Sequence, residues 1–367
     1  MKKGSIRHMF PGNNTGGGFF SYFAYILPQK KINRFYCLKG GPGVGKSSLL
    51  KRLGERLNAD GYDLEYMHCA SDPNSLDGLV IPKLGVALVD GTAPHVIDPV
   101  YPAAVDEIVN LGEFWEGEAI RANRDEIIRI NFEIKLHYKR AFKYLAASKC
   151  ILDDLFETFE SALDPAGPLL EAQYIIDKEL MRLNGCGRPG DIRRLFASAI
   201  TPNGIVHHME SLKDDDYTVY LIKNQWGAGV HTLLQRINDE AIRLGLNTEL
   251  YYKPLSPDTR IEHMLIPELK LALFSEMDGF EMKSRQFETL DLLKYMDASQ
   301  LFAQKDALEF DAATFYMLQN EAINVLSNTK GLHDELEVYY IPHMDFDRVH
   351  EKEEMIYKQI LELATVR

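Results

Sequence analysis

The sequence predicts an α/β protein built from two copies of one fold, each a parallel sheet flanked by helices. Short apolar segments of strand type alternate with helical segments, as at 34 to 39 and 46 to 57, and this alternation is typical of parallel sheets covered on both faces. Segments of the first half recur in the same order in the second half. A chain of 367 residues is also long enough for two separate cores.

The internal repeat covers nearly the whole chain. The matching segments are "IRHMF" at 6 to 10 with "IRRLF" at 192 to 196, "CLKGGPGVGKSSLLKRL" at 37 to 53 with "LIKNQWGAGVHTLLQRI" at 221 to 237, "IPKLGVAL" at 81 to 88 with "IPELKLAL" at 266 to 273, and "LAASKCILDDL" at 145 to 155 with "LSNTKGLHDEL" at 326 to 336. The glycine-rich "NGCGRPG" at 184 to 190 is the expected linker. We therefore predict domains at 1–186 and 190–367.

The first copy has a clear order of elements. The aromatic and apolar run at 34 to 39 predicts a strand, and the leucines that follow Lys46 at helical spacing predict a helix. Segments 62 to 69 and 83 to 90 predict a second strand and a third, buried one.

A long helical segment follows in each copy. From about 118 to 163 apolar residues fall three or four apart, which indicates one long helix or two nearly collinear ones. "DPAGP" at 164 to 168 breaks the helix, and the apolar residues after it predict a return helix packed antiparallel. The expected helical hairpins cover about 118 to 183 and about 298 to 364. Such a hairpin completes a core, or serves as a lid or a partner surface.

Composition and charge exclude several classes of protein. The net charge is −13, and the basic run "HYKRAFK" at 137 to 143 is better explained as a solvated helix face than as a nucleic-acid site. We find no apolar run long enough to span a membrane. The four cysteines, Cys37, Cys69, Cys150 and Cys186, are far apart and form no metal-binding pair. We expect a cytoplasmic protein with free thiols.

The strongest local motif is "GGPGVGKS" at 40 to 47, which fits G-x-x-x-x-G-K-[ST] between a strand and a helix. Glycines let successive N–H groups point into one concavity that holds phosphates. Lys46 is expected to reach the β- and γ-phosphate oxygens, and the Ser47 hydroxyl to bind Mg²⁺. The predicted nucleotide-binding residues are Gly40, Gly41, Pro42, Gly43, Val44, Gly45, Lys46, Ser47 and Ser48.

Three further residues of the first copy are candidates for chemistry. Asp90 ends a buried strand, where an aspartate supports Mg²⁺ in such sites, although a turn role is the alternative. Asp72 follows the second strand. It either orients a water molecule or accepts a proton from the substrate, or it forms an Asx turn before Pro73. His95 either contacts a phosphate or caps a loop. We predict Lys46, Asp90 and Asp72 as catalytic residues, with Ser47 and Asp90 as metal ligands.

The second copy has lost these groups. Its glycine loop has Asn224, Val230 and His231 where the first copy has Gly40, Lys46 and Ser47, and Ser275 replaces Asp90. Residues kept in both copies, such as Arg7 with Arg193, are better explained as scaffold, and those kept only in the first copy as site. We therefore expect one nucleotide per chain.

These motifs resemble those of P-loop NTPases, and more narrowly those of an uncharacterised bacterial family of duplicated P-loop ATPases. The resemblance rests on "RHMFPGNNTGGGF", "LKGGPGVGKSSL", "VDGTAPHVIDPVYPAAVDEIVNLGEF" and the "RRLF" of the second copy. It implies two tandem P-loop NTPase domains, the second degenerate, with ATP and Mg²⁺ bound by the first.

Three functions follow as hypotheses, with a Mg-dependent ATPase first. A kinase needs arginines over a second substrate, and the clustered candidates are Arg121, Arg124 and Arg129, whose spacing is irregular for one helix face. A nucleotide-sensing scaffold with negligible turnover is third. The second copy is expected to regulate the first or to serve as structure, with Arg193, Arg194 and Arg260 as the basic residues it offers to the nucleotide. An additional protein or small-molecule partner, and pairing of the copies within or between chains, both stay open.

Overall fold

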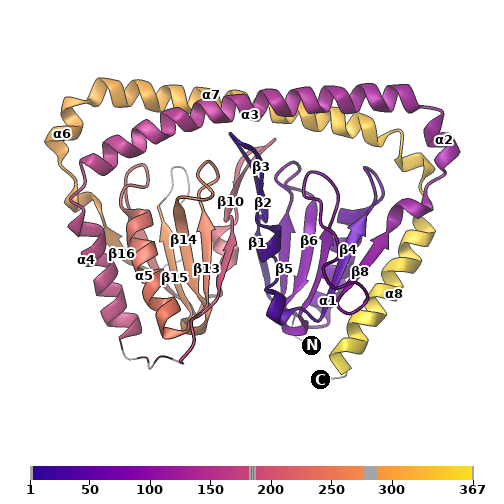
Figure 1. Ribbon diagram of the computed structural model, residues 1–367, viewed down its shortest axis with the longest axis horizontal. Coiled ribbons are helices and arrows are strands. Elements are labelled where there is room, and N and C mark those ends of the chain that lie inside the picture. The colour runs from indigo at the N-terminus through magenta and orange to yellow at the C-terminus, as the bar shows by residue number, and fades with distance from the viewer. Residues whose placement is uncertain (1–2, 182, 184, 186, 277–286, 366–367) are drawn as a thin grey trace.

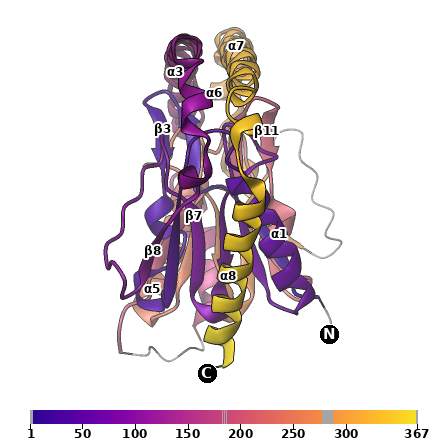
Figure 2. The same cartoon turned by 90° about the vertical axis from the view of Figure 1, so that its right-hand side faces the viewer.

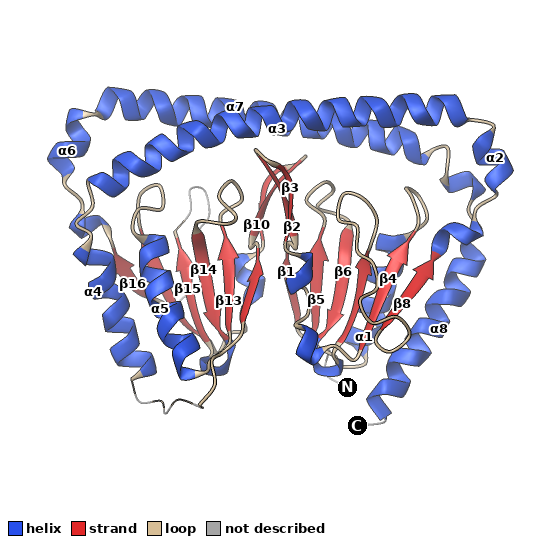
Figure 3. Ribbon diagram, viewed as in Figure 1, coloured by secondary structure: helices blue, strands red, loops and turns tan. Residues whose placement is uncertain are grey.

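The computed structural model describes residues 3–181, 183, 185, 187–276 and 287–365. These residues form two six-stranded sheets with helices around them, as Figures 1 and 3 show. The α/β class and the duplication are therefore confirmed, since the two sheets have the same order of corresponding strands.

The first sheet has the order β1-β5-β6-β7-β4-β8. Its strands are β1 (Ile6–Met9), β4 (Arg34–Lys39), β5 (Leu64–His68), β6 (Leu76–Ile81), β7 (Val86–Asp90) and β8 (Asp106–Asn110). A small hairpin of β2 (Gly12–Thr15) and β3 (Gly18–Ser21) extends from its β1 side.

The second sheet has the order β9-β13-β14-β15-β12-β16. Its strands are β9 (Ile192–Leu195), β12 (Thr218–Lys223), β13 (Thr248–Tyr252), β14 (Ile261–Ile266), β15 (Leu271–Ser275) and β16 (Glu288–Asp291). The hairpin of β10 (Ser198–Thr201) and β11 (Gly204–His207) corresponds to β2 and β3.

Both sheets are mixed, so the predicted parallel sheet is observed only in part: most strands are parallel and one strand in each sheet is reversed. In the first sheet β6 runs antiparallel to β5 and β7, whereas β4 is parallel to β7 and β8. The predicted strands did not include "LDGLVI" at 76 to 81. The connections on either side of it are too short for a crossover helix, and the chain must therefore reverse direction.

Two of the helices, α3 and α7, are very long. The α-helices are α1 (Lys46–Ala59), α2 (Gly117–Arg121), α3 (Arg124–Ser161), α4 (Ala166–Ile175) with the π-helical turn η5 (Ile176–Leu180), α5 (Val230–Leu244), α6 (Ala298–Ala303), α7 (Lys305–Glu337) and α8 (Phe346–Thr365). Figure 1 shows α3 and α7 side by side above both sheets.

Each long helix carries the chain to the opposite sheet. Ile175 and Leu180 pack in the core of the second sheet, together with residues of α5 such as Leu233. In the reverse direction, Val349 and Ile356 of α8 pack in the core of the first sheet, and α8 runs beside α1 (Figure 2). The two units have exchanged their last helices.

The predicted hairpin within each copy was therefore wrong. The partner of α3 is α7 of the other copy, and α4 packs on α5 rather than returning along α3. Helical periodicity identifies the apolar face of a helix but not the element that covers it. The 38 residues of α3 span about 57 Å, which takes its end beyond the first unit. The domain division at 1–186 and 190–367 stays a prediction, and part of the expected linker lies outside the described residues.

A shared core joins the two sheets. Met67 and Val89 of the first sheet and Tyr251 and Phe274 of the second belong to one buried apolar cluster. Near it, the backbones of Phe10 and Phe196 exchange two hydrogen bonds, of 2.9 and 3.0 Å. We describe each sheet with the helices packed on it as a unit: the first unit ends with α8, and the second contains α4.

The helices and the cysteines bear on two expectations from composition, that no segment spans a membrane and that the thiols are free. Among the described helices, none is both long enough and apolar enough to cross a membrane. Cys37, Cys69 and Cys150 are free thiols, and Cys186 lies outside the described residues.

Candidate functional site

The glycine loop joins β4 to α1, in the strand-loop-helix context that its motif requires. Gly43 and Gly45 adopt φ values of 71° and 84°, which side chains with a β-carbon rarely adopt. Gly45 directly precedes the first turn of α1. Val44 is buried in the core of the first unit, and Ser48 is exposed on α1.

Lys46 folds back over the loop. Its Nζ donates hydrogen bonds to the carbonyl oxygens of Gly40 and Gly41, at 2.7 and 2.9 Å. The same ammonium group lies 3.5 Å from Asp90 Oδ2. Two of the residues predicted as catalytic are thus brought together.

Ser47 and Asp90 occupy neighbouring elements at this edge. Ser47 lies in the first turn of α1, and its Oγ accepts a hydrogen bond from the Leu76 N–H at 3.0 Å. Asp90 is the last residue of β7 and pairs in register with Leu38 of the loop strand. Its Oδ1 accepts hydrogen bonds from the N–H and the hydroxyl of Thr92, at 2.9 and 2.6 Å. The other oxygen, Oδ2, faces Lys46.

Asp72 forms a turn at the same edge. Its Oδ1 accepts a hydrogen bond from the Asn74 N–H at 3.2 Å, and its Oδ2 accepts one from the Ser75 hydroxyl at 2.8 Å. Lys330 of α7 lies 3.9 Å from the same Oδ2. The turn alternative is therefore observed, together with a contact from the second copy that the sequence did not indicate.

A buried acid in this region was missed by the sequence analysis. Asp77 lies in β6, and burial, together with the nearby Asp90 carboxylate, raises the pKa of Asp77 to about 8. His95 lies beside it, with Nε2 4.0 Å from Asp77 Oδ1, and burial lowers the pKa of His95 to about 4. The sequence did contain a signal for this residue, since an acid inside the apolar run "LDGLVI" is unusual and indicates a functional or paired group.

The glycine loop is covered by a segment from near the end of the chain. A β-carbon at Gly43 would lie 2.8 Å from Ile341, and one at Gly41 would lie 3.0 Å from the ring of Trp115. Tyr340 lies against Trp115, with ring centroids 5.5 Å apart. Trp115 also forms an antiparallel bridge with Met344. We name residues 338–345, which connect α7 to α8, the covering segment.

The loop of the second unit keeps its backbone shape but not its chemistry. Gly227 and Gly229 have φ values of 84° and 75°, close to those of their counterparts in the first loop. Buried Val230 stands where the first loop has Lys46. The His231 Nδ1 accepts a hydrogen bond from the Ile261 N–H at 3.3 Å, which repeats the bond from Leu76 to Ser47.

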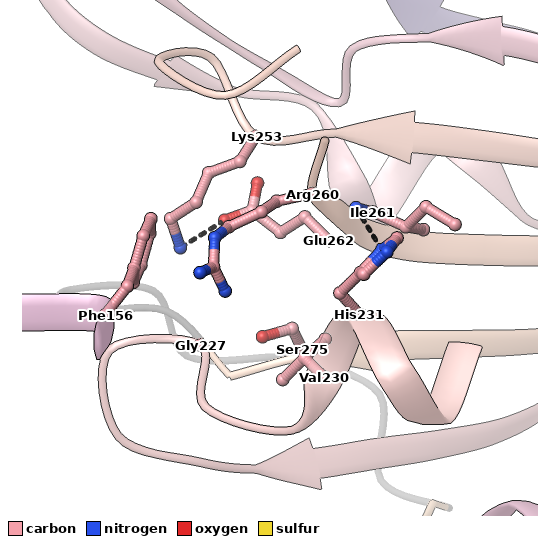
Figure 4. Close-up of a pocket in the computed structure, with 9 residues that line it drawn as sticks. All are labelled: Phe156, Gly227, Val230, His231, Lys253, Arg260, Ile261, Glu262 and Ser275. Carbon is pink, nitrogen blue, oxygen red and sulfur yellow. Dashed lines mark hydrogen bonds and ion pairs between the residues drawn. The ribbon is translucent and has the colours of Figure 1, made fainter. Parts of the chain in front are cut away.

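A small polar pocket lies at this second loop (Figure 4). Two cations enter it from outside the loop. Lys253 lies 3.1 Å from Glu262, and the guanidinium of Arg260 lies 3.9 Å from the ring centroid of Phe156 on α3. Arg260 also pairs with Glu160 of α3 at 2.6 Å. Protein carboxylates therefore neutralise both cations.

The arginines that the sequence offered to the nucleotide have other contacts. Arg193 pairs with Glu65 across the unit interface and with Glu249 of its own unit. Arg194 lies over the rings of Tyr25 and Tyr252, and Arg260 lines the second pocket. These positions argue against a role for them at the first loop.

Comparisons of the chain with protein-family models, with curated proteins and with solved structures found no match.

Proposed function

We propose that the first unit binds ATP with Mg²⁺ and hydrolyses the nucleotide, while the second unit has a structural or regulatory role. The single observation that carries the proposal is the position of Lys46, whose Nζ lies 2.7 Å from Gly40 O and 3.5 Å from Asp90 Oδ2. A lysine held over a glycine loop at a helix N-terminus is an arrangement that suits a polyphosphate.

The residues at the loop have complementary tasks. The backbone N–H groups of the loop and the N-terminus of α1 would hold phosphate oxygens. Lys46 would exchange its bonds to the two carbonyl oxygens for bonds to phosphate. Ser47 and Asp90 supply the oxygen donors that Mg²⁺ prefers, so the donor set fits this ion. When bound, Mg²⁺ neutralises negative charge on the phosphates.

The covering segment supports a role in turnover. Trp115, Tyr340 and Ile341 are large side chains against the loop, and excluding water strengthens the electrostatic contacts at a reacting phosphate. The segment leads directly from α7, which packs along α3. Nucleotide binding at the loop would thus affect the positions of both long helices, and this offers a route for regulation within the chain.

A kinase activity has less support. Arg121 and Arg124 are exposed and pair with Glu118 and Asp125, and Arg129 pairs with carboxylates of α3 and α7. None of these contacts leaves an arginine positioned over an acceptor at the loop. We therefore rank the ATPase ahead of the kinase.

The test uses the full-length protein with γ-labelled ATP, Mg²⁺ and a metabolite extract. We expect label in free inorganic phosphate, at a rate that Lys46→Ala strongly reduces. Label on a metabolite would show a kinase, and nucleotide binding without transfer would show a sensing role. Release at an equal rate by the variant would place the activity elsewhere in the sample.

A further inference from the structure

Three side chains from consecutive parts of the first unit converge beside the glycine loop. Asp77 comes from β6, Asp90 ends β7, and His95 lies in the connection after β7. Each offers a potential ligand atom, and these atoms all lie within 4.8 Å of one another. The side chains of Asp77 and His95 are only 7% and 5% exposed.

The imidazole of His95 is held in place but forms no hydrogen bond within the described part of the chain. Its ring stacks on Phe23, with centroids 4.3 Å apart and planes 11° apart, and the centroid of the Phe19 ring lies 5.7 Å from that of His95. Both ring nitrogens are buried and lack a hydrogen bond there. Because buried polar atoms are nearly always paired, an imidazole with two nitrogens that form no hydrogen bond, placed beside two acidic side chains, indicates a ligand site.

The remaining charges near the cluster are accounted for by other contacts. Asp90 Oδ1 accepts hydrogen bonds from Thr92, and Asp90 Oδ2 lies beside Lys46. Lys46 forms its hydrogen bonds with the loop carbonyl oxygens and lies at the distance of an ion pair from Asp90. The two acidic side chains and the imidazole thus have one cation beside them, Lys46, which lies 3.5 Å from Asp90 Oδ2.

We propose that Asp77, Asp90 and His95 bind a divalent transition-metal ion, of the Mn²⁺ or Zn²⁺ class, in the absence of nucleotide. A mixed set of imidazole and carboxylates suits these ions, whereas Mg²⁺ is usually bound by oxygen donors and retains several waters. The site differs from the proposed Mg²⁺ pair of Ser47 and Asp90, although both include Asp90. It goes beyond the proposed function and does not depend on it, because the ion would bind without nucleotide.

The second unit lacks this donor set in its described part. Glu262 corresponds to Asp77, but it pairs with Lys253, and Ser275 stands where Asp90 does. The segment after Glu276 that corresponds to the His95 region lies outside the described residues. We therefore expect one such ion from the first unit.

The experiment titrates full-length, chelator-treated protein with Mn²⁺ and, separately, with Mg²⁺, without nucleotide. Binding is followed by the loss of the free Mn²⁺ electron paramagnetic resonance signal and by calorimetry. We expect one Mn²⁺ per chain, bound more tightly than Mg²⁺. The near-isosteric Asp77→Asn and the His95→Gln variants should each weaken Mn²⁺ binding at least about tenfold.

The control is His333→Gln, because the potential ligand atoms of His333, Asp334 and Glu337 on α7 also lie within 4.8 Å of one another. This variant should keep wild-type Mn²⁺ affinity. Circular dichroism and the melting temperature report whether each variant folds, and the Co²⁺ absorption spectrum of the wild type gives an independent sign of a nitrogen ligand.

Three results would overturn the site: equal affinity for Mn²⁺ and Mg²⁺, wild-type affinity in folded Asp77→Asn and His95→Gln, or loss of binding only in His333→Gln. Because no nucleotide is present, failure of the metal site and failure of ATP binding are read out separately.

Discussion

Arg193 of the second sheet and Glu65 of the first are joined across the unit interface, with Nη2 2.6 Å from Oε2. Arg7 and Glu249, which occupy the corresponding positions in the duplicate, form the reciprocal ion pair. Within each unit, Arg7 lies 3.0 Å from Glu65, and Arg193 lies 3.2 Å from Glu249. The four residues close a largely buried ring of ion pairs, which explains why both copies keep them.

Removing one carboxylate from this ring should strongly destabilise the protein. Glu249→Gln leaves Arg7 and Arg193 with one acceptor less in a buried setting, and breaking such a pair costs about 3–5 kcal/mol of unfolding free energy. Urea denaturation at pH 7 gives this value. As a control, Lys30→Ala removes only the exposed pair with Asp191 and should change stability by less than about 1 kcal/mol. Equal effects of the two variants would contradict a structural role for the ring.

The same ring predicts a pH dependence. Burial alone raises the pKa of Glu249, but the guanidinium groups of Arg7 and Arg193 outweigh it and lower the pKa to about 2 from an ordinary value of 4.5. A lowered pKa in the folded state gives stability that is present above pH 4.5 and is lost as the pH falls towards 2. The difference in unfolding free energy between wild type and Glu249→Gln should therefore be constant from pH 8 to 5. It should shrink below that range, and a difference that grows on acidification would reverse the assignment.

Loss of the loop lysine should weaken nucleotide binding. A hydrogen bond to a charged group is worth roughly 1.5–3 kcal/mol, so Lys46→Ala should raise the Kd for Mg-ATP by an order of magnitude or more. Lys223→Ala removes the exposed lysine just before the second loop and should leave the Kd unchanged. Calorimetry should give one site per chain. Two equivalent sites in the wild type would show that the second loop also binds nucleotide.

The exchange of helices predicts how the chain can be divided. A fragment of residues 1 to 188 should fold poorly, because it lacks α8, whose Val349, Ile356 and Ile360 are fully buried against the first sheet. Since Trp115 and Met344 are bridged, residues 1 to 115 joined by a short glycine linker to 344 to 367 should form a more stable unit. Circular dichroism and size-exclusion chromatography compare the two. A compact, cooperatively folding 1 to 188 fragment would show that α8 is dispensable.

The local context of the glycine loop and the duplication were predictable from the sequence, because each depends on patterns a few residues long. The strand before Gly40, the helix from Lys46 and the strand ending at Asp90 all occur as expected. The antiparallel strand β6 was not predicted, since the apolar pattern of a strand does not show in which direction it runs in the sheet. Likewise, nothing in the periodicity of α3 indicates that α7, rather than α4, lies beside it. The cluster of Asp77 with His95, and the covering segment, depend on contacts between distant parts of the chain.

The position of α8 also has a consequence for biosynthesis. The core of the first unit contains Val109 from the last strand of its sheet and Ile360 from near the C-terminus. At ordinary rates of translation, roughly 10 to 50 s separate the synthesis of these two residues. During that interval the apolar surface of the nascent first sheet has no final helix to cover it. The half that is synthesised first is thus among the last to complete its core, and a chaperone that shields apolar surface would suit the nascent chain.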